Sequence, residues 1–237
     1  MPLEAKVRSV RDSICGLLRV RALPDKQVNL AIVGTTWCVV QNRYFLTAQH
    51  VLNDGNPRNP ADQFIIIRAP GNGTRLERFP VVGFRLEDAQ HDFAILEIHD
   101  PATQGAMVPS LRISFESVRD GTDVLTYGCP APRVTGASLA QGQLHFQTAL
   151  VATANHGMVS AQFPPPEAPL YVFNVHWFSG ESGGPILDTK TLRVFSVMQR
   201  YMNVEAPHGI IAGPRMGRSL AAIRDHLQAL LLRKKWW

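Results

Sequence analysis

The stretch Gly180-Glu181-Ser182-Gly183-Gly184-Pro185 places a serine hydroxyl between glycines at a sharp turn. Glycine adopts backbone angles that are closed to other residues, so such a turn can point two backbone N–H groups into one small space. Those N–H groups are suited to hold an oxygen that becomes negative when a carbonyl carbon is attacked. A serine alone is a poor nucleophile, so the pattern indicates chemistry only where a base is available.

The chain supplies a base and a carboxylate upstream of this turn. His50 lies in Leu46-Thr47-Ala48-Gln49-His50-Val51, and Asp92 lies in His91-Asp92-Phe93-Ala94-Ile95-Leu96. Among the eight histidines, His50 is distinguished by the buried-strand pattern that precedes it. The order His, Asp, Ser is one of the linear orders in which a catalytic triad occurs.

The choice of the acid is less direct, because Asp88 and Asp100 are nearby alternatives to Asp92. The apolar run 93–96 directly after Asp92 favours it, since an orienting carboxylate should lie at the mouth of a buried strand. The neighbouring His91 is predicted to be a surface residue.

The segments TAQHV, HDFAIL and SGESGGPI resemble the three signatures of the chymotrypsin-fold (trypsin-like) serine peptidases. The resemblance runs from about Val28 to the C-terminal helix and is closer in style to HtrA-type and other bacterial members than to digestive enzymes. One departure is Gln49, where the family has a small residue or asparagine; it alters packing and leaves the proton chemistry untouched. HtrA proteins usually add a PDZ domain, for which we expect no room after the helix.

The resemblance implies an all-β fold of two six-stranded antiparallel β-barrels, with the active site in the crevice between them and a C-terminal helix. We expect a first lobe at 1–115 that carries His50 and Asp92, and a second lobe at 116–237 that carries Ser182.

The same resemblance implies the role of each site residue. Ser182 attacks a peptide carbonyl and forms an acyl-enzyme, His50 takes and returns the proton, and Asp92 orients the imidazole. The backbone N–H groups of Gly180 and Ser182 form the oxyanion hole.

Glu181 bears on regulation, because secreted trypsins usually have an aspartate there that pairs with a newly cut N-terminal amine. The chain has no recognisable activation sequence before its first barrel strand. We therefore expect activity without N-terminal trimming; a solvent-facing Glu181 carries equal weight as an alternative.

By resemblance, the substrate pocket is lined by the residues before the serine turn and by the strand after it: His176, Trp177, Gln199, Arg200 and Tyr201. Trypsins carry at position 176 the aspartate that selects Lys or Arg, so the histidine predicts against tryptic specificity. With Arg200 nearby, an acidic or polar P1 residue is an alternative. An alignment slip of one residue would change which side chains of this strand line the pocket.

Composition agrees with a fold of many strands. The 237 residues include 18 glycines and 17 prolines, and the apolar runs are short. Val7, Val10, Ile14 and Leu17 follow helical spacing, while 14–20 fits a first strand equally well. A hairpin is predicted from 30–40 and 44–47, turned at 41–43. Further strands are expected at 64–69, 79–86, 93–98, 124–127, 144–153, 170–176, 185–188 and 193–201.

A surface connection and a C-terminal helix are expected outside the strands of the second lobe. The proline-rich segment 162–169 is predicted to be a surface connection. Leucine and isoleucine spacing after Ser219, a plausible helix cap, predicts the C-terminal helix; its apolar face is Leu220, Ile223, Leu227, Leu230 and Leu231.

Charge and cysteine content exclude several other classes. The net charge of +5 is scattered, and no aromatic-interleaved basic platform or phosphate loop predicts a nucleic-acid partner. No metal-ligand spacing is evident, and we expect no cofactor. The apolar runs are too short to span a membrane. Three separated cysteines and a start without a signal-like core favour the bacterial cytoplasm; an exported protein made without its leader is the alternative.

Three functional readings of the sequence differ in class. A serine endopeptidase acting on protein or peptide leads, a silent binding or scaffold module of the same fold is second, and an esterase with the same triad is third. The α/β-hydrolase form is disfavoured by the residue order. The tail 230–237, with its paired tryptophans, either contacts a separately encoded regulatory partner or packs back on the barrel.

Overall fold

The computed structural model describes residues 2–23, 27–40, 42–53, 58–70, 76–99, 107–130, 133–140, 143–206 and 209–233. Within these ranges, the side chains of 133–149, 200–213 and Arg233 are not described. The predicted alternative acid Asp100 and residues 234–237 of the tail therefore lie outside the described residues.

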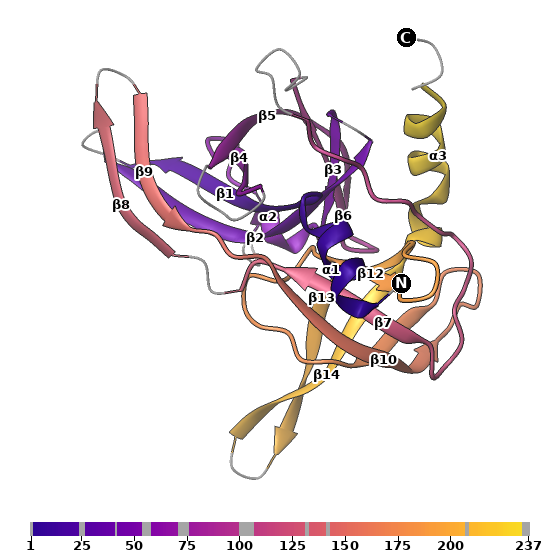
Figure 1. Cartoon of the computed structure of the whole chain (residues 1–237). Helices are drawn as coiled ribbons and strands as arrows, with labels where there is room; N and C mark the ends of the chain where they lie inside the picture. Colours follow the sequence, from indigo (N-terminus) through magenta and orange to yellow (C-terminus); the bar gives the residue numbers. More distant parts are fainter. Residues whose placement is uncertain are drawn as a thin grey trace.

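The first half of the chain forms a closed antiparallel barrel in the order β1-β2-β3-β6-β5-β4 (Figure 1). Its strands are β1 (Ile14–Ala22), β2 (Val28–Val40), β3 (Tyr44–Thr47), β4 (Gln63–Arg68), β5 (Glu77–Asp88) and β6 (Phe93–Ile98). The predicted hairpin is β2–β3, which turns through Asn42 in the left-handed region at φ 62°.

The second half forms another closed barrel in the order β10-β11-β14-β13-β12-β7. Its strands are β7 (Asp123–Gly128), β10 (Thr153–Phe163), β11 (Leu170–Asn174), β12 (Pro185–Asp188), β13 (Val194–Ala206) and β14 (Gly209–Ser219). The predicted fold of two six-stranded antiparallel barrels is confirmed. Closure leaves neither barrel with an open edge, so each of its strands pairs on both sides.

Each barrel has its own apolar core, and a third core joins them. Phe45, Leu52 and Phe64 are among the buried residues of the first barrel, and Tyr171, Phe173 and Phe195 are among those of the second. The shared core contains residues of both barrels and both terminal helices, including Val10, Trp37, Phe93, Tyr127, Leu187 and Leu227. Burial of one such side chain contributes about 1.5–3 kcal/mol, so the shared core holds the two barrels in a fixed relation.

The two ends of the chain are helical and contribute to the shared core. Helix α1 (Leu3–Arg11) buries Val10, and the Tyr127 hydroxyl donates a hydrogen bond to the Val7 carbonyl. Because α1 ends at Arg11 and β1 begins at Ile14, residues 14–20 form the first strand and do not continue the helix. At the other end the predicted cap is confirmed: the Ser219 hydroxyl accepts from the Ala221 N–H.

The C-terminal segment continues from this cap into a 3₁₀ turn and a helix. The 3₁₀ helix spans Leu220–Ile223 and α3 spans Arg224–Arg233. The predicted apolar face faces the protein: Leu220, Ile223, Leu227 and Leu230 are buried in the shared core, and Leu231 packs against it.

The strand predictions are wrong at three places in the second half. The expected strand 144–153 is divided, because β9 (Gln143–Ala149) leaves the barrel to pair with β8 (Arg133–Ala140), and β10 begins only at Thr153. The expected connection 162–169 begins later, since β10 continues to Phe163 and pairs there with Leu170. Strand β14 was not predicted, because Gly213-Pro214 and Gly217 are strand breakers locally; pairing with β13 and β11 overrides them.

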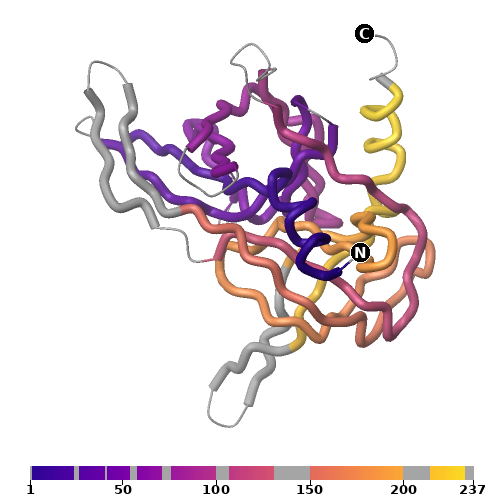
Figure 2. The backbone as a smooth tube through the Cα atoms, in the orientation of Figure 1, coloured from indigo at the N-terminus to yellow at the C-terminus, as the bar shows by residue number. Residues whose placement is uncertain are grey.

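The segment 107–122 leads to β7, the first strand of the second barrel (Figure 2). Two hydrogen bonds fasten this crossing segment to opposite barrels: Leu111 N–H to the Cys38 carbonyl at 3.0 Å, and Ser114 N–H to the Val194 carbonyl at 2.8 Å. The expected division after residue 115 falls inside this segment and stays a prediction.

Candidate active site

His50 and Asp92 meet at one end of the first barrel. Strand β3 ends at Thr47, and His50 begins the one-turn helix α2 (His50–Asn53). The Asp92 carboxylate accepts the His50 backbone N–H at 2.8 Å, and its two oxygens lie 2.9 and 3.1 Å from His50 Nδ1. A carboxylate beside Nδ1 keeps the proton there, which leaves Nε2 as the free acceptor of a neutral imidazole.

Asp92 occupies a strained backbone position. Its φ is 60°, in the left-handed region that residues other than glycine rarely adopt, although aspartate is among those that enter it most often. Directly after it, β6 begins at Phe93, which is fully buried. Asp92 therefore lies at the mouth of a buried strand, the kind of position that the sequence predicted for the orienting acid.

Ser182 lies in the turn before β12, close to the first barrel. The Ser182 carbonyl accepts the Thr35 N–H of β2 at 2.8 Å. A Cβ placed on the neighbouring Gly34 would lie 2.6 Å from Val51 Cγ1 and 2.9 Å from the Ser182 carbonyl oxygen. Helix α2 and the serine turn therefore approach the same point of β2, which brings the histidine and serine segments together.

The Ser182 hydroxyl donates a hydrogen bond to the Gln199 carbonyl at 3.3 Å. Among the described residues, no hydrogen bond joins Ser182 to His50. The serine hydroxyl and the His50–Asp92 pair thus lie at neighbouring points of the same site, with the hydroxyl turned toward β13.

Gln199 joins the two halves of the site. Its side chain is 4% exposed and donates through Nε2 to the His91 carbonyl at 2.6 Å and the Asp92 carbonyl at 2.9 Å. These bonds fasten the strained turn at Asp92 to β13, while the Gln199 backbone holds the serine hydroxyl. Sequence reasoning expected Gln199 in the substrate pocket and missed this contact, because a glutamine in a strand carries no local sign of a partner in the other barrel.

Asp88 and His91 form a second pair of the same form. The Asp88 carboxylate accepts the His91 backbone N–H at 3.0 Å and lies 2.8 Å from His91 Nδ1. Burial alone would raise the pKa of Asp88, but the hydrogen bonds from His91 outweigh it and the pKa is lowered. The His91 side chain is 30% exposed, so it is partly covered. The structure therefore pairs Asp92, and not Asp88, with His50.

The segment around Ser182 consists of two successive turns. The Glu181 N–H donates to the Phe178 carbonyl at 3.1 Å with Gly180 at φ 95°, and the Gly184 N–H donates to the Glu181 carbonyl at 3.0 Å with Gly183 at φ 87°. A hydrogen bond from the fourth residue to the first, with positive φ at the third, is the pattern of a type II turn. Both turns therefore need glycine at the third position.

Three N–H groups of these turns are left over. Within the part of the chain that the structure describes, the N–H groups of Ser179, Gly180 and Ser182 have no hydrogen-bond acceptor, whereas those of Phe178, Glu181, Gly183 and Gly184 do. The Gly180 and Ser182 groups are the two that the sequence predicted for the oxyanion hole. Unpaired donors beside a serine hydroxyl are suited to stabilise negative charge on a bound oxygen.

Glu181 lies inside the protein, so the alternative of a solvent-facing glutamate is wrong. It is fully buried and accepts hydrogen bonds from the Phe178 N–H at 2.6 Å, the Thr153 hydroxyl at 2.8 Å and the Asn155 amide at 3.3 Å. Burial raises the pKa of Glu181, and the hydrogen bonds oppose that rise. The carboxylate fastens the serine turn to β10 through neutral donors.

The residues predicted for the substrate pocket lie in different environments. His176 is exposed after the end of β11, and Trp177 is buried with its ring centroid 6.2 Å from that of Phe173. Arg200 and Tyr201 belong to β13, but their side chains are not described. The Gln199 side chain bonds to the His91 and Asp92 carbonyls instead of to His176 or Trp177.

Phe178 is a neighbour of the site that sequence reasoning missed. Its side chain is 61% exposed although its backbone is fixed by Glu181. An exposed aromatic ring held beside the serine turn is available to contact a substrate.

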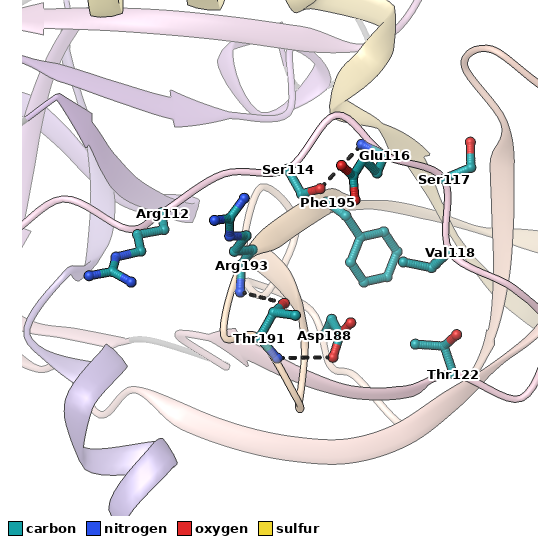
Figure 3. A pocket seen from close by; sticks show the side chains of 10 residues that line it. All are labelled: Arg112, Ser114, Glu116, Ser117, Val118, Thr122, Asp188, Thr191, Arg193 and Phe195. Carbon is teal, nitrogen blue, oxygen red and sulfur yellow. Dashed lines mark hydrogen bonds between the residues drawn. The ribbon is translucent and has the colours of Figure 1, made fainter.

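A cavity of about 500 Å³ lies away from the triad (Figure 3). It is bounded by the crossing segment 112–122 and by 188–195 around the β12–β13 turn, and none of the triad residues lines it. Within its walls, the Thr191 N–H donates a hydrogen bond to the Asp188 carboxylate at 3.3 Å.

Metal-ligand clusters and membrane-spanning helices are both absent among the described residues. These residues contain no group of three His, Cys, Asp or Glu side chains placed to hold a metal ion. None of their helices has both the length and the apolar character needed to cross a bilayer. Cys15, Cys38 and Cys129 are all buried and unbridged.

The arrangement of two barrels with a His–Asp pair and a serine turn has counterparts among known proteins. The family model described as "Trypsin-like peptidase domain" matches residues 34–196, from within β2 to within β13. The chain belongs to this family. The match includes His50, Asp92 and Ser182 of this trypsin-like peptidase, a serine hydrolase.

Solved structures show the same fold. The HtrA-type protease AlgW with decapeptide matches with a TM-score of 0.67 and 14% sequence identity, over 98% of this chain and 68% of AlgW. A serine-to-alanine variant of AlgW, also with decapeptide, matches with a TM-score of 0.65 and 14% identity, over 98% and 67%. No curated protein matches this trypsin-like peptidase in sequence.

Proposed function

We propose that the chain is a serine endopeptidase that hydrolyses peptide bonds through an acyl-enzyme on Ser182. The observation that carries the proposal is the pair of unpaired N–H groups, Gly180 and Ser182, beside a serine hydroxyl. The His50–Asp92 pair adds to it, because an imidazole held by a carboxylate at Nδ1 is prepared to accept a proton at Nε2.

The reaction begins when the Ser182 hydroxyl turns from the Gln199 carbonyl toward His50 Nε2, a rotation about one side-chain bond. Ser182 Oγ then attacks the peptide carbonyl carbon, and its proton passes to Nε2. The oxyanion accepts hydrogen bonds from the Gly180 and Ser182 N–H groups. The imidazolium, stabilised by Asp92, gives its proton to the leaving amine. Water repeats the same steps on the acyl-enzyme and releases the acid.

The proposed substrates are extended peptides with a non-basic P1 residue. A peptide bound to AlgW supports a peptide substrate, and the exposed His176 supports the absence of attraction for a cationic side chain. On a peptide library, we expect fewer cuts after Lys or Arg than after other residues, with no cuts by Ser182→Ala. Cleavage mainly after Lys or Arg would show that the pocket interpretation is wrong.

We further propose that this activity needs no newly cut N-terminus. Glu181, which would pair with such an amine, is already bound by Thr153, Asn155 and the Phe178 N–H. Protein whose intact mass corresponds to the full 237-residue chain should therefore hydrolyse substrate. The proposal fails if mass spectrometry finds activity only in a shortened form.

One observation favours the second candidate, a catalytically silent module that binds peptides. The Ser182 hydroxyl is bonded to Gln199 and not to His50. If that bond persisted, the serine would not be activated. Covalent labelling of the serine distinguishes the two candidates, since a silent module would not react.

For the cellular setting we propose a reducing compartment such as the bacterial cytoplasm. The three cysteines are buried and form no disulfide bond, and burial raises the pKa of the Cys15 thiol well above its usual value. A separately encoded regulatory partner stays a prediction, because residues 234–237 of the tail lie outside the described part.

A further inference from the structure

Thr35 of β2 contacts the serine turn at two points from the other barrel. Its N–H donates to the Ser182 carbonyl at 2.8 Å, and its hydroxyl donates to the Gly180 carbonyl at 2.8 Å. The same hydroxyl accepts the Cys129 N–H at 2.8 Å, and the Thr35 carbonyl accepts the Thr47 hydroxyl at 2.7 Å. Thr35 is fully buried, so these contacts fix it in one position.

The two carbonyls that Thr35 holds determine how the neighbouring peptide groups are turned. A peptide group is planar, so fixing its oxygen orients its N–H as well. The Gly180 carbonyl is held by Thr35 while the following N–H, of Glu181, is held by Phe178. The Ser182 carbonyl is held by Thr35 while the following N–H, of Gly183, is held by the Met198 carbonyl at 2.7 Å.

The unpaired N–H of Ser182 lies between these two fixed peptide groups, and the unpaired N–H of Gly180 immediately precedes them. Rotation of either peptide group would move these donors. Rotation of the peptide group between Gly180 and Glu181 would also turn the Gly180 carbonyl and break its hydrogen bond with Thr35. Glu181 holds the turn from the second barrel, so Thr35 supplies a separate attachment.

We propose that Thr35 is a positioning residue, which sets the two oxyanion N–H groups from the first barrel. It touches neither the substrate nor the reacting atoms and acts through the Gly180 and Ser182 carbonyls. The inference rests on the proposed peptidase function and adds to it that the oxyanion site of the second barrel is completed by a hydroxyl of the first.

Thr36 provides a matched control for this role. It is the next residue of β2, it is also fully buried, and its hydroxyl donates to the Leu46 carbonyl at 2.9 Å, inside the first barrel. Valine has nearly the shape of threonine, so Thr35→Val and Thr36→Val each remove one buried donor; Thr35→Val also removes the acceptor of the Cys129 N–H. Thr35→Ser keeps the hydroxyl and should restore function.

Removal of one oxyanion donor typically lowers turnover by about 10²–10³-fold. Displacing the donors should have a smaller effect, so for Thr35→Val we expect a decrease in kcat of about 10–100-fold with little change in KM. Affinity for a peptide aldehyde, whose adduct carries an oxyanion, should fall with kcat/KM. The pH profile should not move, because His50 and Asp92 are intact. Thr36→Val and Thr35→Ser should stay within about threefold of the wild type.

Hydrogen exchange gives a readout that does not depend on activity. Thr35→Val should speed exchange in the peptide covering 178–184 while Thr36→Val does not. Equal losses of kcat in the two valine variants, or unchanged exchange in Thr35→Val, would overturn the role of Thr35. A wild-type protein without hydrolytic activity would count against the proposed function alone, and the exchange comparison would still decide the positioning role.

Discussion

Replacing Ser182 with alanine is expected to lower the turnover of a peptide substrate by about 10⁶-fold. The substitution removes only the hydroxyl oxygen, whose one described hydrogen bond is to the Gln199 carbonyl at 3.3 Å. The serine turn is held by its backbone, so its conformation should persist. The residual rate then reflects only substrate binding and the oxyanion N–H groups.

Ser179 offers the matched control for this prediction. It is an exposed serine in the same pair of turns, and the structure gives its side chain no part in the site. Ser179→Ala should retain wild-type turnover, measured with the same purified peptide and with thermal unfolding as a check on folding. Ser182→Ala that keeps more than about a hundredth of the activity would exclude Ser182 as the nucleophile.

Asp92→Asn is expected to lower kcat by about 10⁴-fold with an intact fold. The asparagine oxygen can still accept the His50 backbone N–H, which now bonds to the carboxylate at 2.8 Å. Its NH₂ group then faces His50 Nδ1 and donates to it. The imidazole proton is thereby moved to Nε2, where the proton of Ser182 should be received.

Asp88→Asn is the control for this second prediction, because Asp88 bonds to His91 as Asp92 bonds to His50. It should change kcat by less than about threefold, since the pair Asp88–His91 has no place in the proposed reaction. Kinetics of both variants on one ester and one peptide substrate decide the matter. A larger loss of kcat in Asp88→Asn than in Asp92→Asn would show that Asp92 is not the orienting acid.

The sequence predicted those parts of the site that are encoded locally. The glycines at 180 and 183 require positive φ, and a serine between them marks the turn without reference to the rest of the fold. Likewise, the apolar runs before His50 and after Asp92 indicate buried strands. Each of the two residues therefore lies near the end of a strand, where its side chain can reach the site. The architecture followed because these three segments resemble one family.

What the sequence did not predict depends on contacts between distant segments. Thr35 is one of several β-branched residues in β2, and nothing beside it indicates a partner at Gly180, in the other barrel. In the same way, nothing in the sequence around Gln199 indicates its hydrogen bond to the Asp92 carbonyl. Strand β14 shows the same limit for the fold, since its proline and glycines oppose a strand locally and only its pairing with two neighbours stabilises it.

The buried position of Glu181 is a further case. A glutamate in a glycine-rich turn is ordinarily a surface residue, because an ionised carboxylate loses much solvation on burial. Here Thr153 and Asn155 of β10 and the Phe178 N–H compensate for that loss. None of the three is recognisable as a partner until the turn and β10 are placed together.

The central claim is that Ser182 is activated by His50, and covalent labelling with a fluorophosphonate probe tests it most directly. We predict a single phosphonyl adduct, mapped by peptide mass spectrometry to Ser182, which is lost in Ser182→Ala and in His50→Ala. A folded wild-type protein that stays unlabelled, or an adduct on Ser182 that forms equally fast without His50, would contradict it.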